Sequence, residues 1–225
     1  LINSPSNPTG MVMDKNIMEK IAYIAIKHNL FVISDELYED IVFDDRKHIS
    51  IASLRDMKER TITIFGFSKS YAMTGWRIAY MACPEFLIRE IIKIQQNTSV
   101  CPNSVTQRAV LFGLQNSNKT RQSICEMQKA YQKRRDLIMN GFRGIDGFHC
   151  LTPEGSFYAF PNITKTKKSS EELSMYMLEQ CGIATVPGSA FGKYGEGYLR
   201  FSFATSLDNI EKGIEKIKLG IKNLN

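Results

Sequence analysis

Apolar residues recur at helical spacing near the start of the chain. Residues 13–29 carry one apolar stripe, and Asp14 stands where a helix cap is expected. The stripe consists of Ile17, Ile21, Ile24 and Ala25. This spacing predicts an amphipathic helix that spans most of the segment.

Short, continuous apolar runs follow the predicted helix. They cover residues 30–33, 61–65 and 77–82, and the chain itself opens inside a sequence typical of a strand. Such runs are typical of strands that are buried on both faces of a sheet. Helices are expected next at residues 84–96 and 102–116. Strands that alternate with helices predict an α/β fold with a mainly parallel sheet.

The pattern changes in the second half of the chain. A long, heavily charged helix is expected over residues 118–143, with further helices at 170–181 and 206–223. The short strands expected here lie around residues 148–151, 155–160, 183–187 and 197–203. We therefore predict a large α/β domain over residues 1–117, a connecting helix over 118–143, and a small α+β domain over 144–225.

Composition excludes several classes of protein. Of 225 residues, 43% are hydrophobic and 23% are charged, which is typical of globular proteins. The net charge is +6, but the basic clusters lack interleaved aromatic residues, so we expect solvated helix faces at Lys133–Arg135 and no nucleic-acid partner. No apolar run is long enough for a membrane helix, because Lys27, His28 and Asn29 interrupt the best one.

Cysteine and histidine usage predicts a reduced protein without a metal site. The five cysteines are scattered and form no C-x-x-C pair, which favours free thiols and a cytoplasmic location. His28, His48 and His149 lie far apart in the sequence, so no metal ligand set is expected. The chain begins at Leu1 inside a predicted strand, and we expect it to be part of a longer polypeptide.

Polar groups follow the predicted strands at the positions where an open α/β sheet binds ligands. Asp35 comes directly after one strand, and Tyr38 lies about one helical turn further on; a helix cap and a core tyrosine are the alternative interpretations. Lys69 follows the next strand in a polar loop, although most lysines are surface residues. Arg77 follows Gly75, whose freedom of rotation would permit a turn, and its planar guanidinium suits phosphate.

Two further residues are candidates for ligand binding. Asn7 lies in an Asn-Pro-Thr-Gly sequence that indicates a turn, and its amide could donate to a ligand oxygen. Arg200 stands between apolar residues of a predicted strand, where an arginine is costly unless a carboxylate meets it. That carboxylate could belong to a substrate or to a structural salt bridge. An amine, a carboxylate, a phenol and arginines are the groups that pyridoxal phosphate requires of a protein.

Six blocks of sequence, in order along nearly the whole chain, resemble the class I/II aminotransferases of fold type I. The blocks are SPSNPTG (4–10), SDELYEDIVF (34–43), FSKSYAMTGWRIAY (67–80), PEGSFYAFPNI (153–163), VPGSAFG (186–192) and YLRFSFATSLDNIEKGIEKI (198–217). The likeness is greatest to the aspartate aminotransferase branch. It implies a homodimeric, pyridoxal-phosphate-dependent enzyme that moves an amino group from an amino acid to a 2-oxo acid by ping-pong chemistry.

The resemblance also implies a role for each candidate residue. Lys69 is the lysine that forms the Schiff base with the cofactor and then moves the proton. Asp35 is the partner of the ring nitrogen, and Tyr38 binds the phenolic oxygen. Arg77 binds phosphate. The remaining two are Asn7, for the phenolic oxygen and the substrate, and Arg200, for the substrate carboxylate.

The chain departs from the family pattern in two respects. Gly66 stands where many relatives have a phosphate-binding serine. The N-terminal half that precedes the Asn-Pro-Thr-Gly block in relatives is absent, so we expect the 225 residues alone to turn over little substrate. Because the resemblance covers only part of the length of these enzymes, two alternatives to an aminotransferase remain. One is a lyase on the same fold, and the other is a non-catalytic cofactor-sensing domain of a transcription regulator. The resemblance also implies a cis peptide bond between Asn7 and Pro8.

Overall fold

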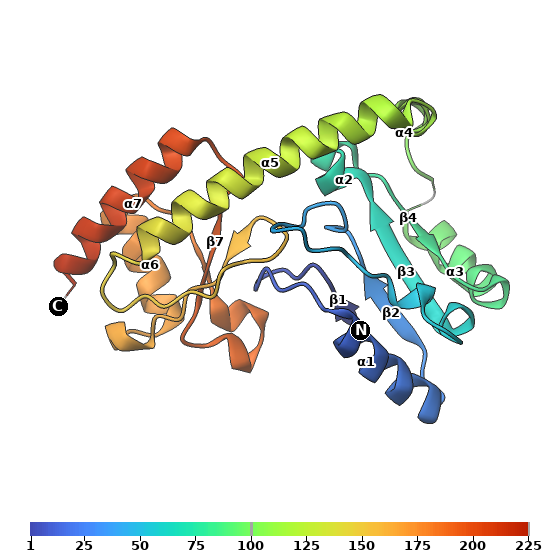
Figure 1. Ribbon diagram of the computed structural model, residues 1–225, viewed down its shortest axis with the longest axis horizontal. Coiled ribbons are helices and arrows are strands. Elements are labelled where there is room, and N and C mark those ends of the chain that lie inside the picture. The colour runs from blue at the N-terminus through green and yellow to red at the C-terminus, as the bar shows by residue number, and fades with distance from the viewer. Residues whose placement is uncertain (100, 225) are drawn as a thin grey trace. The chain divides into compact units, whose positions relative to one another are not determined.

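The computed structural model describes residues 1–99 and 101–224, which form two compact units (Figure 1). Unit 1 consists of Leu1–Pro5 and Val12–Met127. Unit 2 consists of Ser6–Met11 and the chain from Gln128 onwards. Residues 100 and 225, which fall within the domains predicted from the sequence, lie outside the described residues.

A four-stranded sheet forms the centre of unit 1. Its order is β1 (Ile2–Asn3), β2 (Val32–Asp35), β3 (Thr61–Gly66) and β4 (Ala79–Ala82). The first three strands are parallel and β4 is antiparallel to β3. The mainly parallel sheet predicted from the apolar runs is therefore confirmed, and its parallel strands end together at one edge.

Helices connect and flank these strands, as the alternating pattern predicts. Unit 1 contains α1 (Lys15–Lys27), α2 (Phe67–Ser70), α3 (Glu85–Thr98) and α4 (Ser104–Gln115), with 3-10 turns η1 (Ile51–Ser53), η2 (Lys58–Arg60) and η3 (Thr74–Trp76). Helix α5 (Ser117–Phe142) is continuous, and its residues are divided between the two units. No helix in the described part of the chain is both long and apolar enough to cross a membrane.

The buried face of α1 differs from the predicted stripe. Asp14 caps the helix as expected, accepting a hydrogen bond from the Ile17 N–H at 2.8 Å. The buried residues, however, are Met18, Ala22 and Ala25, while Ile17 and Ile24 are exposed. The small alanines let the helix approach β2 and the turn at η1, where Met18 packs into the core cluster. Of the predicted stripe, Ala25 is buried and Ile21 packs against this cluster, so the prediction is wrong for Ile17 and Ile24.

The strands of unit 1 are not buried on both faces, contrary to the prediction. In β2 only alternate positions are buried, and Ile33 is 39% exposed. Every residue of β4 is exposed, including Tyr80 and Met81. One face of the sheet packs on α1, and a smaller cluster of Phe67, Ile78 and Val110 covers part of the other. The elements present in this chain are too few to cover both faces.

Unit 2 is built on a small antiparallel sheet. Its strand order is β5 (Tyr158–Ala159), β7 (Leu199–Ser202) and β6 (Val186–Pro187). Helices α6 (Ser170–Cys181) and α7 (Leu207–Lys222) lie side by side beside it (Figure 1). The strand predicted at 148–151 is wrong, since that segment contributes only an isolated bridge between His149 and Asn162.

The interior of unit 2 is aromatic and closely packed. Its fully buried side chains include Phe142, Leu173, Met177, Leu199 and Phe203. The predicted solvated face at residues 133–135 is wrong for Arg135, which is only 3% exposed. Its Nη1 donates to the carbonyl oxygen of Pro153 at 3.1 Å, and its Nη2 lies 2.7 Å from Asp136. These partners offset the cost of burying the charge.

Candidate functional site

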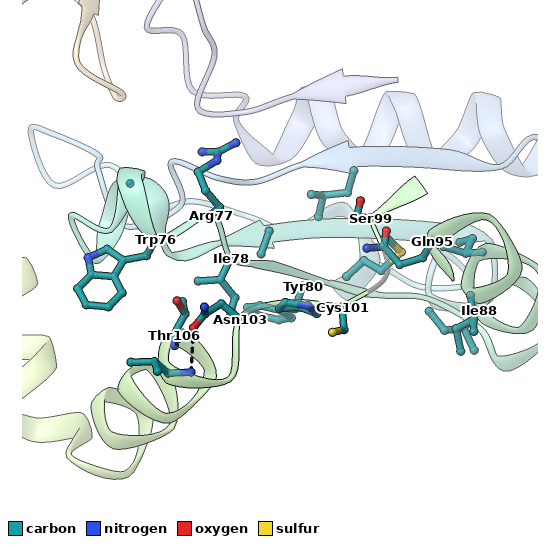
Figure 2. A pocket seen from close by; sticks show the side chains of 18 residues that line it. Trp76, Arg77, Ile78, Tyr80, Ile88, Gln95, Ser99, Cys101, Asn103 and Thr106 are labelled. Atoms are coloured by element: carbon teal, nitrogen blue, oxygen red, sulfur yellow. Dashed lines mark hydrogen bonds between the residues drawn. The ribbon is translucent and has the colours of Figure 1, made fainter. Parts of the chain in front are cut away.

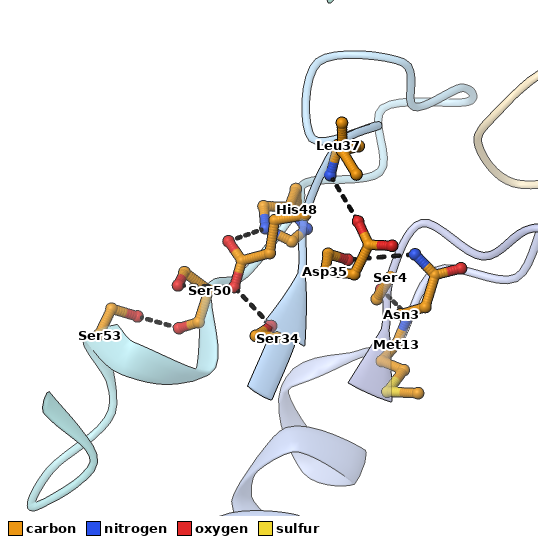
Figure 3. Close-up of polar contacts among 10 residues, drawn as sticks. Asn3, Ser4, Met13, Ser34, Asp35, Leu37, His48, Ser50 and Ser53 are labelled. Atoms are coloured by element: carbon orange, nitrogen blue, oxygen red, sulfur yellow. Dashed lines mark hydrogen bonds and ion pairs between the residues drawn. The ribbon is translucent and has the colours of Figure 1, made fainter. Parts of the chain in front are cut away.

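Asp35 ends β2 and is held there by its neighbours in unit 1. Its carbonyl oxygen accepts a hydrogen bond from the Asn3 side-chain amide at 3.1 Å, and its Oδ1 accepts from the Leu37 N–H at 3.3 Å (Figure 3). A turn, not a helix, follows, so the interpretation of Asp35 as a helix cap is wrong. Burial raises the pKa of the Asp35 carboxyl; the Leu37 N–H lowers it and the charge of Glu36 raises it.

Tyr38 and Lys69 come together in unit 1 from two adjacent strand ends. Tyr38 lies in the turn after β2 and is 4% exposed. Lys69 lies in the short helix α2, directly after β3, and not in the open loop that the sequence suggested. Its Nζ is 5.9 Å from the centroid of the Tyr38 ring. Because β2 and β3 are parallel neighbours, with Asp35 opposite Ile64, all three side chains belong to one edge of the sheet.

Arg77 follows η3 and has a left-handed backbone, with φ 51° and ψ 54°. The turn that aims it was expected to use Gly75, but Gly75 is not in the left-handed region. Arginine itself therefore takes the conformation that glycine adopts most readily. The side chain is exposed, and its Nη1 donates to the carbonyl oxygen of Thr74 at 3.0 Å.

The structure gives a steric reason for Gly66, the position that departs from the family pattern. Gly66 is the last residue of β3 and pairs with Ala79 of β4. A Cβ atom at this position would overlap Cδ2 of Leu37 and would lie 3.6 Å from the Ala79 Cβ. A serine here would require Leu37, in the turn that follows Asp35, to move.

Asn7 and Arg200 are in contact within unit 2. The Arg200 Nη1 donates to the Asn7 side-chain oxygen at 2.8 Å, and the Asn7–Pro8 peptide bond is cis, as expected. The guanidinium carbon lies 4.4 Å from the centre of the Tyr158 ring and 5.1 Å from that of Phe191. Its Nε is buried and has no hydrogen-bond partner among the described residues.

These contacts test one of the two interpretations of Arg200, the structural salt bridge. Among the residues that the structure describes, no carboxylate is paired with its guanidinium, so the structural salt bridge is not present. The charge is held by an amide and two aromatic rings, which bind a cation without neutralising it.

A buried cluster around Glu36 was not anticipated from the sequence. Glu36, Glu39 and His48 bring their side-chain ligand atoms within 4.8 Å of one another, although the separation of the histidines along the chain indicated no metal ligand set. Glu36 accepts hydrogen bonds from Ser34 and Ser50 at 2.8 and 2.9 Å and lies 2.7 Å from His48 Nε2 (Figure 3). These contacts form a hydrogen-bonded cluster within unit 1.

Burial also marks Glu39 as a perturbed carboxyl group. Desolvation, together with the charges of Asp40 and Glu36, raises the pKa of Glu39 to about 7, while His48 and Arg121 act in the opposite direction. For Glu36, the signal available in the sequence was its spacing of two residues from Ser34 at the end of a predicted strand, which favours the same side for both side chains.

A large cavity of unit 1 lies beside this edge and contains only Arg77 of the candidate residues. Its volume is about 1180 Å³, and its walls come from β4, α3, α4 and the segment around η3. Figure 2 shows that the Arg77 side chain points away from Tyr80 and Cys101, which line the apolar part. Asp35, Tyr38 and Lys69 therefore do not line this cavity.

Comparison with known proteins assigns this chain to one family. Residues 1–217 match the family described as aminotransferase class I and II. The chain is 44% identical to an aspartate aminotransferase of Pyrococcus abyssi over 97% of its length, and 41% identical to aromatic-amino-acid aminotransferase 2 of Thermococcus litoralis over 99%.

Solved structures agree with this assignment. An aromatic aminotransferase from Pyrococcus horikoshii superposes over 98% of the chain with a TM-score of 0.95 and 43% identity, covering 59% of that protein. An aspartate aminotransferase from Thermus thermophilus with maleate superposes over 97%, with a TM-score of 0.91 and 33% identity. The chain spans about half the length of its relatives, 56% and 57% of the two sequences above. It belongs to the class I and II aminotransferase family.

Proposed function

We propose that this chain carries the cofactor lysine and the substrate-carboxylate arginine of a pyridoxal-phosphate-dependent aminotransferase. The observation that carries the proposal is the meeting of Asp35, Tyr38 and Lys69 at the ends of two adjacent parallel strands. An amine, a carboxylate and a phenol gathered at one sheet edge fit the aldehyde, the ring nitrogen and the phenolic oxygen of the cofactor. Family membership supports the same activity.

The groups of unit 1 would divide the work of holding the cofactor. Pyridoxal phosphate, when bound, supplies an aldehyde that takes up the amino group and a ring that withdraws electrons from the substrate carbon. The Lys69 amine would hold the aldehyde of the cofactor and would serve as the group that moves the proton. The raised pKa of Asp35 makes it a stronger base, which suits a partner for a protonated ring nitrogen.

Arg77 is proposed to bind the cofactor phosphate. Its guanidinium is exposed and is anchored through one nitrogen to the Thr74 carbonyl, so the planar fork is fixed at one end. Guanidinium groups bind phosphate through paired hydrogen bonds. With Gly66 in place of a serine, this arginine would carry a larger share of phosphate binding.

Arg200 and Asn7 are proposed to bind the carboxylate shared by the amino acid and 2-oxo acid substrates. The Arg200 Nε is buried without a hydrogen-bond partner in the described residues, and a ligand carboxylate would satisfy it. Asn7 holds the opposite side of the guanidinium and would orient it. We further propose a cytoplasmic homodimer; the free thiols of five cysteines and the exposed apolar surface of unit 1 support this.

Borohydride reduction in the presence of pyridoxal phosphate tests the assignment of Lys69. We expect peptide mapping to find the pyridoxyl label on Lys69, and the label to disappear in Lys69→Ala. Lys93→Ala is the matched control, because Lys93 lies exposed on α3 in an ion pair with Glu90 and should leave labelling unchanged. Label on another lysine, or no label on any lysine, would refute the assignment.

Product analysis then tests the reaction. Assayed in the longer polypeptide expected from the sequence, an amino acid and a 2-oxo acid should be converted in equal amounts into a new 2-oxo acid and a new amino acid. Release of ammonia with no new amino acid would indicate a lyase instead.

A further inference from the structure

The buried carboxylate of Glu36 adjoins Asp35 and joins three segments of unit 1. Its side chain is 1% exposed, accepts hydrogen bonds from Ser34 in β2 and from Ser50, and lies 2.7 Å from His48 Nε2. His48 and Ser50 both belong to the segment that leads into η1. Its backbone N–H donates to the carbonyl oxygen of Ile64 in β3 at 3.0 Å. Burial of a polar side chain is costly unless hydrogen-bond partners replace its lost hydration.

This cluster fixes the turn that bears the proposed cofactor-binding groups. The Glu36 carbonyl oxygen accepts from the Glu39 N–H at 3.0 Å, which closes the turn around Tyr38. On the other side, the Asp35 carbonyl oxygen accepts from the Ser4 N–H at 3.3 Å. Asp35 and Tyr38 are therefore attached to a backbone that the Glu36 side chain ties to the segment before η1.

The charge of Glu36 also acts on Asp35. Two adjacent carboxylates repel each other, and each raises the energy of the ionised form of the other. A positive charge close to both would be stabilised by both. The protonated ring nitrogen that the proposed function assigns to Asp35 would be subject to the charge of Glu36 as well.

Other charged groups surround the cluster. Those whose charges act on Glu39, at the other end of the turn, are Glu36, Asp40, His48 and Arg121. Arg121, on α5, forms an ion pair with Asp40 at 3.0 Å, which leaves Glu36 and Glu39 as the acidic groups nearest to His48. His48 Nε2 faces Glu36, and its Nδ1 is buried without a partner in the described residues.

We propose that Glu36 is a positioning residue for Asp35: its carboxylate, held by Ser34, His48 and Ser50, fixes the Asp35–Tyr38 turn and supplies a second negative charge that acts on Asp35. This inference rests on the proposed function, which assigns Asp35 to the ring nitrogen of the cofactor. The physical effect on Asp35, however, exists in the protein without cofactor.

Titration of the Asp35 carboxyl by ¹³C NMR in the cofactor-free chain, with EDTA present, tests the charge effect. Glu36→Gln keeps the size of the side chain and an oxygen that can accept from Ser34 and Ser50. We expect it to lower the pKa of Asp35 by about half a unit to one unit. Glu59→Gln, an exposed change in the same unit, should shift it by less than about 0.2 unit. An unchanged Asp35 pKa in Glu36→Gln would overturn the proposal.

Amide hydrogen exchange tests whether Glu36 fixes the Asp35–Tyr38 turn. It uses a second variant, so the test remains possible if Glu36→Gln fails to fold. Ser50→Ala removes one donor to Glu36 and leaves the charge in place. We expect exchange at Leu37 and Glu39 to accelerate severalfold while exchange within α1 stays unchanged. Equal exchange in Ser50→Ala and the parent chain would refute the tether.

The two proposals fail separately. Loss of the borohydride label would remove the cofactor assignment and leave the Asp35 titration intact. A label on Lys69 together with an unshifted Asp35 would keep the function and remove the role of Glu36. With cofactor bound, the ¹⁵N shift of the ring nitrogen should report a less protonated ring in Glu36→Gln than in Glu59→Gln.

Discussion

The two units of this chain differ in how completely their elements cover one another. In unit 2, β7 alternates buried and outward residues, and α6 and α7 each bury one face against a shared core. In unit 1, neither α3 nor β4 contains a buried residue. Large apolar side chains on these elements, including Tyr80, Phe86, Ile92 and Ile94, are between 48% and 65% exposed.

This difference shows that amphipathic sequence and a completed core are separate properties. Helix α3 has the pattern of a helix with one apolar face, and β4 has the pattern of a buried strand, yet both lie open to solvent. Exposed apolar surface of this kind is typical of protein interfaces, and an unpaired strand edge readily binds another polypeptide. Unit 2 carries its own core, whereas unit 1 presents apolar surface that another polypeptide can cover.

Truncation of matched phenylalanines gives the largest contrast between the units. Phe203 in unit 2 is fully buried, whereas Phe112 on α4 of unit 1 is 68% exposed. We expect Phe203→Ala to reduce the free energy of unfolding by about 3–5 kcal/mol, because it leaves a cavity. Phe112→Ala should change it by less than about 0.5 kcal/mol. Urea unfolding followed by circular dichroism measures both, and equal losses would contradict the comparison.

Replacement of a helical glycine by alanine should change the stability of the two units in opposite directions, by less than the phenylalanine truncation. A Cβ at Gly141 in unit 2 would lie 2.6 and 2.8 Å from Cγ1 and Cγ2 of Ile214. We expect Gly141→Ala to destabilise by about 1–3 kcal/mol through overpacking. At Gly113 in α4 the nearest atom is Thr120 Oγ1 at 3.8 Å, so Gly113→Ala should stabilise by about 0.5–1 kcal/mol through helix propensity. Thermal midpoints of both variants that move in the same direction would contradict this.

The pH dependence of stability should differ in sign between the units, and this is the smallest effect. The pKa of Glu39 in unit 1 is raised from 4.5 to about 7, so the folded state binds its proton more tightly than the unfolded state. This contribution is full below pH 4.5 and is lost as the pH rises to about 7. In unit 2, hydrogen bonds from the Ser169 N–H and hydroxyl lower the pKa of Glu172, so its contribution is present above pH 4.5 and is lost on acidification.

Two glutamine variants separate these contributions. Glu39→Gln should remove a fall in the unfolding midpoint between pH 4.5 and 7. Glu172→Gln should instead weaken stability at neutral pH and flatten the loss below pH 4.5. Midpoints measured across this range would contradict the assignment if Glu39→Gln retained the slope of the parent chain.

The sequence determined the local elements of both units well. Continuous apolar runs and helical spacing predicted the mainly parallel sheet of unit 1, and the helix at 170–181 was predicted with the bounds that it has. The motif around Lys69 predicted the family, and the ends of two apolar runs marked Asp35 and Lys69 as polar positions at strand ends. These features depend on residues close in the chain, so local pattern carries the information.

Only the tertiary structure decided which apolar faces are buried and which polar groups meet across the chain. Met18 in place of Ile17 on α1, the burial of Arg135, and the Glu36–His48 contact depend on neighbours far away in sequence. The free energy of burying a side chain depends on what covers it, and a one-dimensional pattern contains no record of that. For the same reason β4 is exposed in spite of its apolar sequence. Burial of β4 requires another segment that packs against it, and the apolar pattern does not show whether such a segment is present.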